Sequence, residues 1–189
     1  AQAPDGRYYD IAKAIPVRDQ DSLARGVYGT PVTTRGLAVA DVDGDGALDF
    51  VEANQWHDSY VYRNECPGRC GAFLGLNVLL PLQPSGGASF TVRPGHPSPT
   101  ASLARPAIGA TATVLLPGRT PTAMVDGGSG HSGKRSPAIH FGLGPQPPEL
   151  IPVELKVRDL QGRVCTQTLH LPPGWHTVYV SCPPPKEGR

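Results

Sequence analysis

Glycine and proline recur along almost the whole chain, and they limit its secondary structure more than any other feature does. They account for 23 and 22 of the 189 residues. Both residue types disfavour helix interiors and strand centres, so we expect no long helix. The apolar residues, 39% of the chain, fall in short runs between these turn formers, as in proteins built from short strands. The sequence therefore predicts a loop-rich, all-β protein.

The apolar runs place the expected strands. Residues 36–54 read as a strand, a glycine-rich acidic loop and a second strand, and Val61 and Tyr62 extend a third. The run at 73–80 fits a strand that is buried on both faces. Further strands are expected at 89–92, 110–116, 122–125, 138–141 and 153–157, and in both halves of 165–182. Many short strands separated by turns indicate a β-sandwich or a small barrel, with the acidic repeat packed on it.

Composition divides the chain into four parts. We expect an N-terminal arm at 1–35, an acidic repeat at 36–70, a β domain at 71–182 and an exposed proline-rich tail at 183–189. Within the β domain, residues 84–106 are rich in Pro, Ser, Gly and Thr, which predicts a long surface loop. No apolar run approaches the roughly 18 residues that cross a membrane. Lys and Arg number 17 against 16 acidic residues and form no basic face, so nucleic acid is not expected as a partner.

The four cysteines are Cys66, Cys70, Cys165 and Cys182. The last two bracket a pair of alternating runs joined at 172–174 by Pro-Pro-Gly, which predicts a β-hairpin. Its two cysteines would then face each other at disulfide distance, and the first two would close a tight loop. A zinc site is the alternative, although C-x3-C followed by two isolated cysteines is a poor zinc spacing.

Two disulfides imply an oxidising compartment. The first four residues, AQAP, have neither a charged n-region nor an apolar h-region. The chain is therefore expected to be either cytosolic or already processed by a signal peptidase. The disulfides favour the processed form, and we expect a secreted or surface-exposed protein.

The most acidic stretch of the chain carries carboxylates at the spacing of a calcium-binding loop. Asp41, Asp43, Asp45 and Asp49 stand at loop positions 1, 3, 5 and 9, with glycine at position 6 and the Ala47 carbonyl at position 7. Calcium takes six to eight hard oxygen ligands, and carboxylates this close repel one another without a cation. These five residues are therefore the predicted ligands of a calcium cofactor. The alternative is a solvated acidic turn, because Asp-Gly pairs also form turns.

The same string satisfies the EF-hand pattern, because Glu52 stands at position 12. An EF-hand needs a helix on each side of its loop. Here the flanking runs are short, and Gly36 together with residues 31–34 breaks any helix before the loop. A strand–loop–strand calcium site fits better, and Glu52 is left out of the ligand set.

Two sets of motifs resemble known families. The string GLAVADVDGDGALDF at 36–50, followed by VYRNE at 61–65, resembles one FG-GAP/VCBS repeat, the calcium-binding blade unit of integrin-type β-propellers. Later strings resemble, in order and spacing, the ASPIC/UnbV domain that follows such repeats in the cartilage acidic protein family and its bacterial relatives. These strings are IGATATV at 108–114, VDGGSG at 125–130, HFGLG at 140–144 and VELKV at 153–157.

The resemblance covers roughly residues 36–182. It implies a calcium-dependent extracellular protein of adhesion or matrix contacts, with other proteins or glycans as partners, and it supplies no catalytic residues. The chain departs from the family pattern in three places. It holds one repeat, which cannot close a propeller by itself, His131 replaces a usual Tyr, and residues 158–162 replace a Trp-Pro turn.

No catalytic constellation stands out. The six histidines are scattered, with no H-E-x-x-H pair, and neither G-x-S-x-G nor a P-loop is present. Gly127, Gly128, Ser129 and Gly130, followed by His131, are most simply a turn between strands, with a ligand-binding loop as the alternative. We therefore expect a non-catalytic protein.

Three functions fit these observations. The first is a secreted calcium-stabilised protein that binds proteins or glycans through loops such as 84–106 and 127–137. The second is a structural subunit that polymerises, because a lone repeat leaves strand edges that a neighbour's arm or tail can complete. The third is an accessory domain of a secreted enzyme.

Overall fold

The fold was analysed in a computed structural model, which describes residues 33–55, 58–65, 71–83, 89–98, 103–128 and 136–182. The described residues form twelve strands and no helix, which confirms the all-β prediction. Within these ranges there is accordingly no helix of the length and hydropathy that a membrane span requires. The expected tail, and the expected arm apart from residues 33–35, lie outside the described residues.

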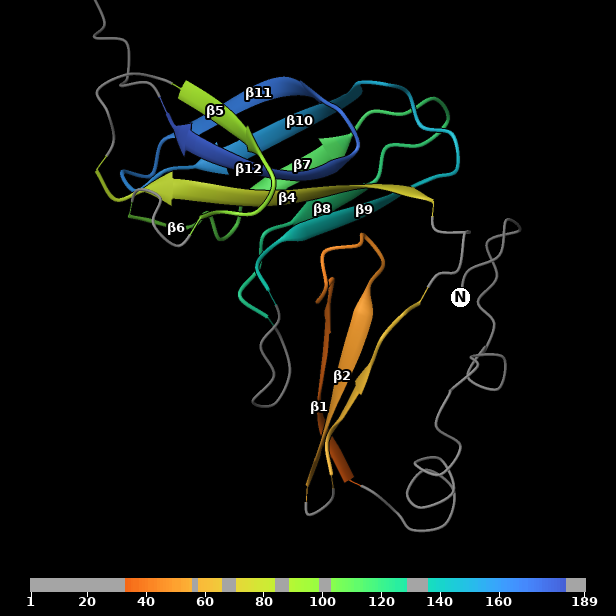
Figure 1. Cartoon of the computed structure of the whole chain (residues 1–189). Helices are drawn as coiled ribbons and strands as arrows, with labels where there is room; N and C mark the ends of the chain where they lie inside the picture. The colour runs from red at the N-terminus through yellow and green to blue at the C-terminus, as the bar shows by residue number, and fades with distance from the viewer. Residues whose placement is uncertain are drawn as a thin grey trace, which may run out of the picture.

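A three-stranded antiparallel sheet comes first in the chain. It contains β1 (Thr33–Ala40), β2 (Asp49–Gln55) and β3 (Tyr60–Tyr62), in that order across the sheet. Rings of Phe50 and Tyr62, paired across β2 and β3, stack with centroids 4.3 Å apart. The acidic residues lie in the loop between β1 and β2, and this end of the sheet points at the rest of the molecule (Figure 1).

The other nine strands form two sheets that face each other as a β-sandwich (Figure 1). One sheet has the order β11-β10-β7-β8, and the other has the order β5-β12-β4-β6, with β9 also paired to β4. No closed barrel is present among the described strands, so the sandwich is the correct alternative of the two expected. The strands are β4 (Ala72–Pro81), β5 (Ser89–Pro94), β6 (Ala104–Pro106), β7 (Thr111–Val114), β8 (Thr122–Met124), β9 (Ile139–Gly144), β10 (Ile151–Arg158), β11 (Val164–Leu171) and β12 (Gly174–Ser181).

The core lies between the two sheets and follows the alternation of the sequence. In β10, Ile151, Val153, Leu155 and Val157 are buried, while every residue between them points outward. This is the period of two that a strand with one covered face requires. The facing sheet contributes the even-numbered residues of β4, from Leu74 to Leu80. On the opposite face of β4 only Gly75 is buried and the other residues are half-buried, so the expectation of a strand buried on both faces was wrong.

The hairpin predicted for 165–182 is not formed. All eight residues of β11 pair with β10, whereas β12 pairs with β4 and β5 in the other sheet. Pro172 and Pro173 have no N–H to donate to a ladder, and Gly174, with φ of 115°, turns the chain toward the second sheet. The sequence alternation of a hairpin is the same as that of two strands in opposite sheets, which is why the pattern misled.

The expected long loop at 84–106 also contains more structure than predicted. Beyond Ser89–Val92, strand β5 continues to Pro94, and β6 pairs with the end of β4. Both strands lie at a sheet edge, where proline is tolerated because the missing N–H faces away from the ladder.

Candidate functional site

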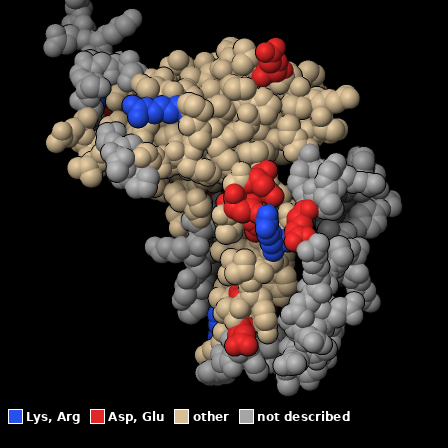
Figure 2. All heavy atoms as spheres, viewed as in Figure 1, with Lys and Arg blue, Asp and Glu red and all other residues tan. Residues whose placement is uncertain are grey.

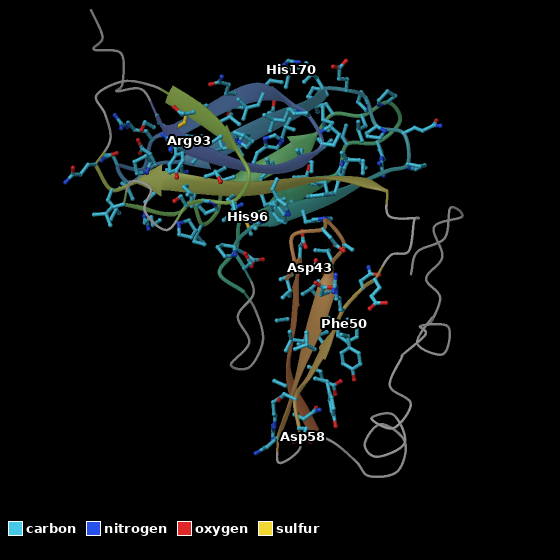
Figure 3. All side chains as sticks on the ribbon, viewed as in Figure 1. Asp43, Phe50, Asp58, Arg93, His96 and His170 are labelled. Atoms are coloured by element: carbon cyan, nitrogen blue, oxygen red, sulfur yellow. A yellow bond between two sulfur atoms is a disulfide. The ribbon has the colours of Figure 1, made fainter. Side chains whose placement is uncertain are left out.

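The candidate site is the loop from Asp41 to Asp49, which we call the acidic loop. Asp41 is the residue that follows β1, Asp43 lies in the turn, and Asp49 is the first residue of β2. One carboxylate oxygen of each of the three lies within 4.8 Å of the others. Figure 2 shows acidic side chains gathered where the three-stranded sheet meets the sandwich, and in Figure 3 Asp43 lies at that end while Asp58 lies at the other.

Backbone N–H groups hold all three carboxylates, and Asp43 accepts one hydrogen bond from the Asp45 N–H at 3.3 Å. The Asp41 carboxylate accepts hydrogen bonds from the backbone N–H groups of Gly44 and Gly46, at 2.8 and 2.9 Å. Asp49 is 2% exposed. It accepts from the N–H groups of Val42 at 3.0 Å and Asn64 at 2.7 Å. The loop is therefore wrapped around its own carboxylates, as in an Asx turn, and their oxygens converge.

One cation compensates part of this charge. Arg63, one residue beyond β3, pairs with the Asp43 carboxylate at 2.6 Å. Three carboxylates in the group less one guanidinium leave two negative charges in close proximity. Negative charges this close repel one another, which favours the binding of a cation between them. A divalent cation has the charge that neutralises these two negative charges.

The remaining predicted ligands lie beside this group. The Asp45 carboxylate is outside the group of three and accepts the N–H of Ala47 at 2.8 Å. Ala47 is buried.

Glu52, which was left out of the predicted ligand set, lies farther along β2, and its carboxylate accepts a hydrogen bond from the Tyr62 hydroxyl at 3.2 Å. Burial raises the pKa of the Tyr62 phenol, and the Glu52 charge raises it further.

An aromatic cluster on the outer face of the sandwich contacts the acidic loop. Trp175 donates its indole N–H to the Asp41 carboxylate at 2.7 Å. His140 Nε2 lies 2.9 Å from the carbonyl oxygen of Gly46, and because a carbonyl only accepts, this nitrogen carries the proton. Phe73 stacks on the His140 ring with centroids 5.1 Å apart. We call these contacts the joint, because they connect the three-stranded sheet to the sandwich.

Sequence reasoning missed the residues of the joint. Trp175 and His140 are 134 and 94 residues away from the loop atoms that they bind. No local spacing connects positions so far apart, and residues 138–141 predicted only a strand. The string VYRNE carried a signal, because its Arg63 and Asn64 both bind carboxylates of the loop.

The other predicted site residues are divided between described and undescribed segments. Gly127 and Gly128 are described, and the Gly128 N–H donates to the Asp126 carboxylate at 2.8 Å. Ser129, Gly130 and His131 lie outside the described residues, as do Cys66 and Cys70. The proposed ligand-binding loop is therefore described only at its first two residues.

Cys165 and Cys182 form a disulfide. It does not connect the two arms of a hairpin, as the sequence suggested. It links the start of β11 in the four-stranded sheet to the residue after β12 in the five-stranded sheet, so it joins the two layers of the sandwich.

The donor set suits a hard cation. The side chains that converge in the acidic loop are all carboxylates. Calcium and magnesium prefer carboxylate oxygens to nitrogen and sulfur ligands. The loop can also offer backbone carbonyls, which calcium accepts in an irregular shell of six to eight oxygens. The residues present therefore fit calcium, and the carboxylates of Asp41, Asp43 and Asp49 are the side chains that would hold it.

Comparison with known proteins identifies the C-terminal part of the chain. Residues 100–186 match the model of the family described as ASPIC and UnbV. A search of curated proteins found no match to the chain. The matched region contains β6 to β12, whereas β4 and β5, which pair with β12, precede it. The C-terminal part of this chain thus contains an ASPIC/UnbV domain, and its sandwich is completed by strands from outside the matched region.

Proposed function

We propose that this chain is a non-catalytic, calcium-binding β protein that works outside the cell in adhesion, matrix contact or ligand binding. The observation that carries the proposal is the convergence of three carboxylates within 4.8 Å on a strand–loop–strand unit. Asp45 and the Ala47 carbonyl, at the neighbouring positions of the loop, are proposed to complete the calcium shell. The resemblance of this unit to an FG-GAP/VCBS repeat supports the same assignment.

The extracellular location rests on the disulfide between Cys165 and Cys182, because disulfides persist mainly in oxidising compartments. The match to the ASPIC/UnbV family supports the proposal that this chain is related to proteins that combine this domain with FG-GAP/VCBS repeats, as the cartilage acidic protein family does. The proposed partners are extracellular proteins or glycans, bound by the loops of the sandwich.

Thermal melting with calcium and with chelator tests the calcium assignment. A ligand at 100 times its dissociation constant stabilises the native state by about 2.7 kcal/mol, which for a chain of this size is a shift of roughly 5–10 °C. Asp43→Asn and Asp49→Asn should abolish the shift. Asp58→Asn, at the far end of the same sheet in Figure 3, is the matched control and should keep it. Superposed curves for the wild-type protein would show that the metal assignment is wrong.

A second candidate function is self-assembly through strand edges. Strands β1 and β3 are the outer strands of the three-stranded sheet. Leu37, Val39 and Val61 on these strands are 61%, 43% and 66% exposed. Edge strands with apolar side chains pair readily with another chain. Sedimentation of the calcium-loaded wild-type protein separates adhesion or ligand binding from self-assembly, because a monomer at micromolar concentration excludes self-assembly.

A further inference from the structure

The joint consists of side chains whose positions depend on the sandwich fold. Phe73, His140 and Trp175 come from β4, β9 and β12, three strands that are neighbours in the five-stranded sheet. Gly75 of β4 is paired both with Trp175 and with His140, so the rings surround it on the same face. Trp175 lies 5.8 Å from Phe73 and 6.0 Å from His140, measured between ring centroids.

Two glycines make this close packing possible. A Cβ atom at Gly75 would overlap the Trp175 ring, so the indole can lie this close to the strand only because no side chain is present there. On the loop side, a Cβ atom at Gly46 would overlap the Phe73 ring, and Gly46 has a φ of +90° that other residues rarely adopt. The loop and the aromatic cluster are therefore fitted to each other in shape as well as in hydrogen bonding.

The hydrogen bonds of the joint reach the proposed calcium ligands directly. Trp175 binds the carboxylate of Asp41, one of the three converging acids. His140 binds the carbonyl of Gly46, which lies between Asp45 and Ala47 in the loop. Any movement of the sandwich away from the three-stranded sheet must break these bonds, and the Asp41 carboxylate then keeps only its hydrogen bonds to Gly44 and Gly46 within the loop.

We propose that the joint couples calcium binding to the docking of the sandwich on the three-stranded sheet, with Trp175 and His140 as positioning residues for the acidic loop. This inference rests on the proposed calcium function. When docked, the sandwich fixes the carboxylates in their converging arrangement, so the loop loses less conformational freedom on binding the cation. By linkage, calcium must tighten docking by the same factor by which docking tightens calcium binding.

Calcium affinity in variants of the joint provides the first test, measured by isothermal titration calorimetry. Trp175→Phe keeps an aromatic ring but removes the N–H donated to a carboxylate, and should weaken affinity on the order of tenfold to 100-fold. His140→Ala should weaken it about two- to tenfold. His140→Gln retains an N–H donor and should restore most of the loss. His170→Ala removes an exposed histidine on β11, which lies in the other sheet (Figure 3), and is the matched control.

Tryptophan fluorescence provides the reciprocal test. The chain has two tryptophans, so Trp56→Phe leaves Trp175 as a single reporter within the joint. Calcium should reduce acrylamide quenching of Trp175 in this protein, because tighter docking shields the indole. The same titration with Asp41→Asn added should show no reduction.

The outcomes separate this inference from the proposed function. If the wild-type protein binds calcium and the folded Trp175→Phe and His140→Ala variants bind it equally well, the coupling is refuted and the calcium site stands. An equal loss of affinity in His170→Ala also refutes the coupling, because the effect is then not specific to the joint. If the wild-type protein does not bind calcium, the proposed function and the coupling both fail. Far-ultraviolet circular dichroism confirms that each variant is folded.

Discussion

Removing the disulfide between Cys165 and Cys182 should lower the stability of the whole sandwich. The perturbation is the double substitution Cys165→Ala and Cys182→Ala, which leaves no unpaired thiol at either position. Because the bond connects one strand of each sheet, its loss should affect the separation of the two layers. A bond within a terminal hairpin, by contrast, would stabilise that hairpin alone.

The size of the effect follows from the length of the closed loop. The two cysteines are 17 residues apart in sequence. Loop-closure entropy for a loop of this length gives a stabilisation of about 3 kcal/mol, exerted mainly on the unfolded state. A change of this size lowers the ratio of folded to unfolded protein on the order of 100-fold. For a protein of this length, it lowers the melting temperature by roughly 6–12 °C.

Equilibrium unfolding in urea is the suitable assay, followed by circular dichroism and by tryptophan fluorescence. Both signals should shift together to lower urea concentration, because the bond joins the two layers. Cys66 and Cys70 stay unchanged in both proteins, which confines the comparison to the bond between the sheets. A loss below about 1 kcal/mol, or a change seen by one probe only, would refute the account of the disulfide as a connection between layers.

Two further predictions concern single positions. Gly75→Ala should destabilise the protein by about 1–3 kcal/mol in urea unfolding, because the new Cβ atom overlaps the Trp175 ring; Gly142→Ala on β9, where the space is open, is the control, and equal losses would contradict the packing argument. Burial raises the pKa of Asp159, but hydrogen bonds from Arg163 and from the backbone outweigh it and lower the pKa below its usual value. The stabilisation by this carboxylate is therefore complete above the unfolded-state pKa and is lost as pH falls through the folded-state pKa. Asp159→Asn should cost about 1.5–3 kcal/mol at pH 7 and less at pH 3, so a difference that does not change with pH would count against this ion pair.

The strands could be predicted from the sequence because each is a local pattern. In β10 every second residue from Ile151 to Val157 is apolar and buried, so the pattern alone indicates both the strand and its inner face. The assignment of strands to sheets could not be predicted in the same way. The run that forms β12 alternates as a hairpin arm would, yet it pairs with β4 from the first part of the domain.

In the candidate site, too, the local pattern could be predicted and the contacts between distant residues could not. The spacing of the aspartates in the acidic loop predicted a convergence of carboxylates, and Asp41, Asp43 and Asp49 do converge. Asp45 stands at an equally regular position but turns to the N–H of Ala47, which spacing cannot indicate. The contact of Trp175 with Asp41 depends on the three-dimensional arrangement of two sheets, for which the sequence carried no local signal.

The parallel pairing of β4 with β12 has a consequence for the order of events during synthesis of the chain. Leu74 of β4 pairs with Gly174, about a hundred residues later, and β12 is also the only bridge between β4 and β5 among the described strands. The apolar run of β4 therefore leaves the ribosome long before its parallel partner β12 exists. Contacts between positions so distant form slowly, and unpaired apolar strands associate with other chains in the meantime. The sheet that carries the joint can be completed only after β12 has been made, so nascent chains depend on protection of β4 until that strand arrives.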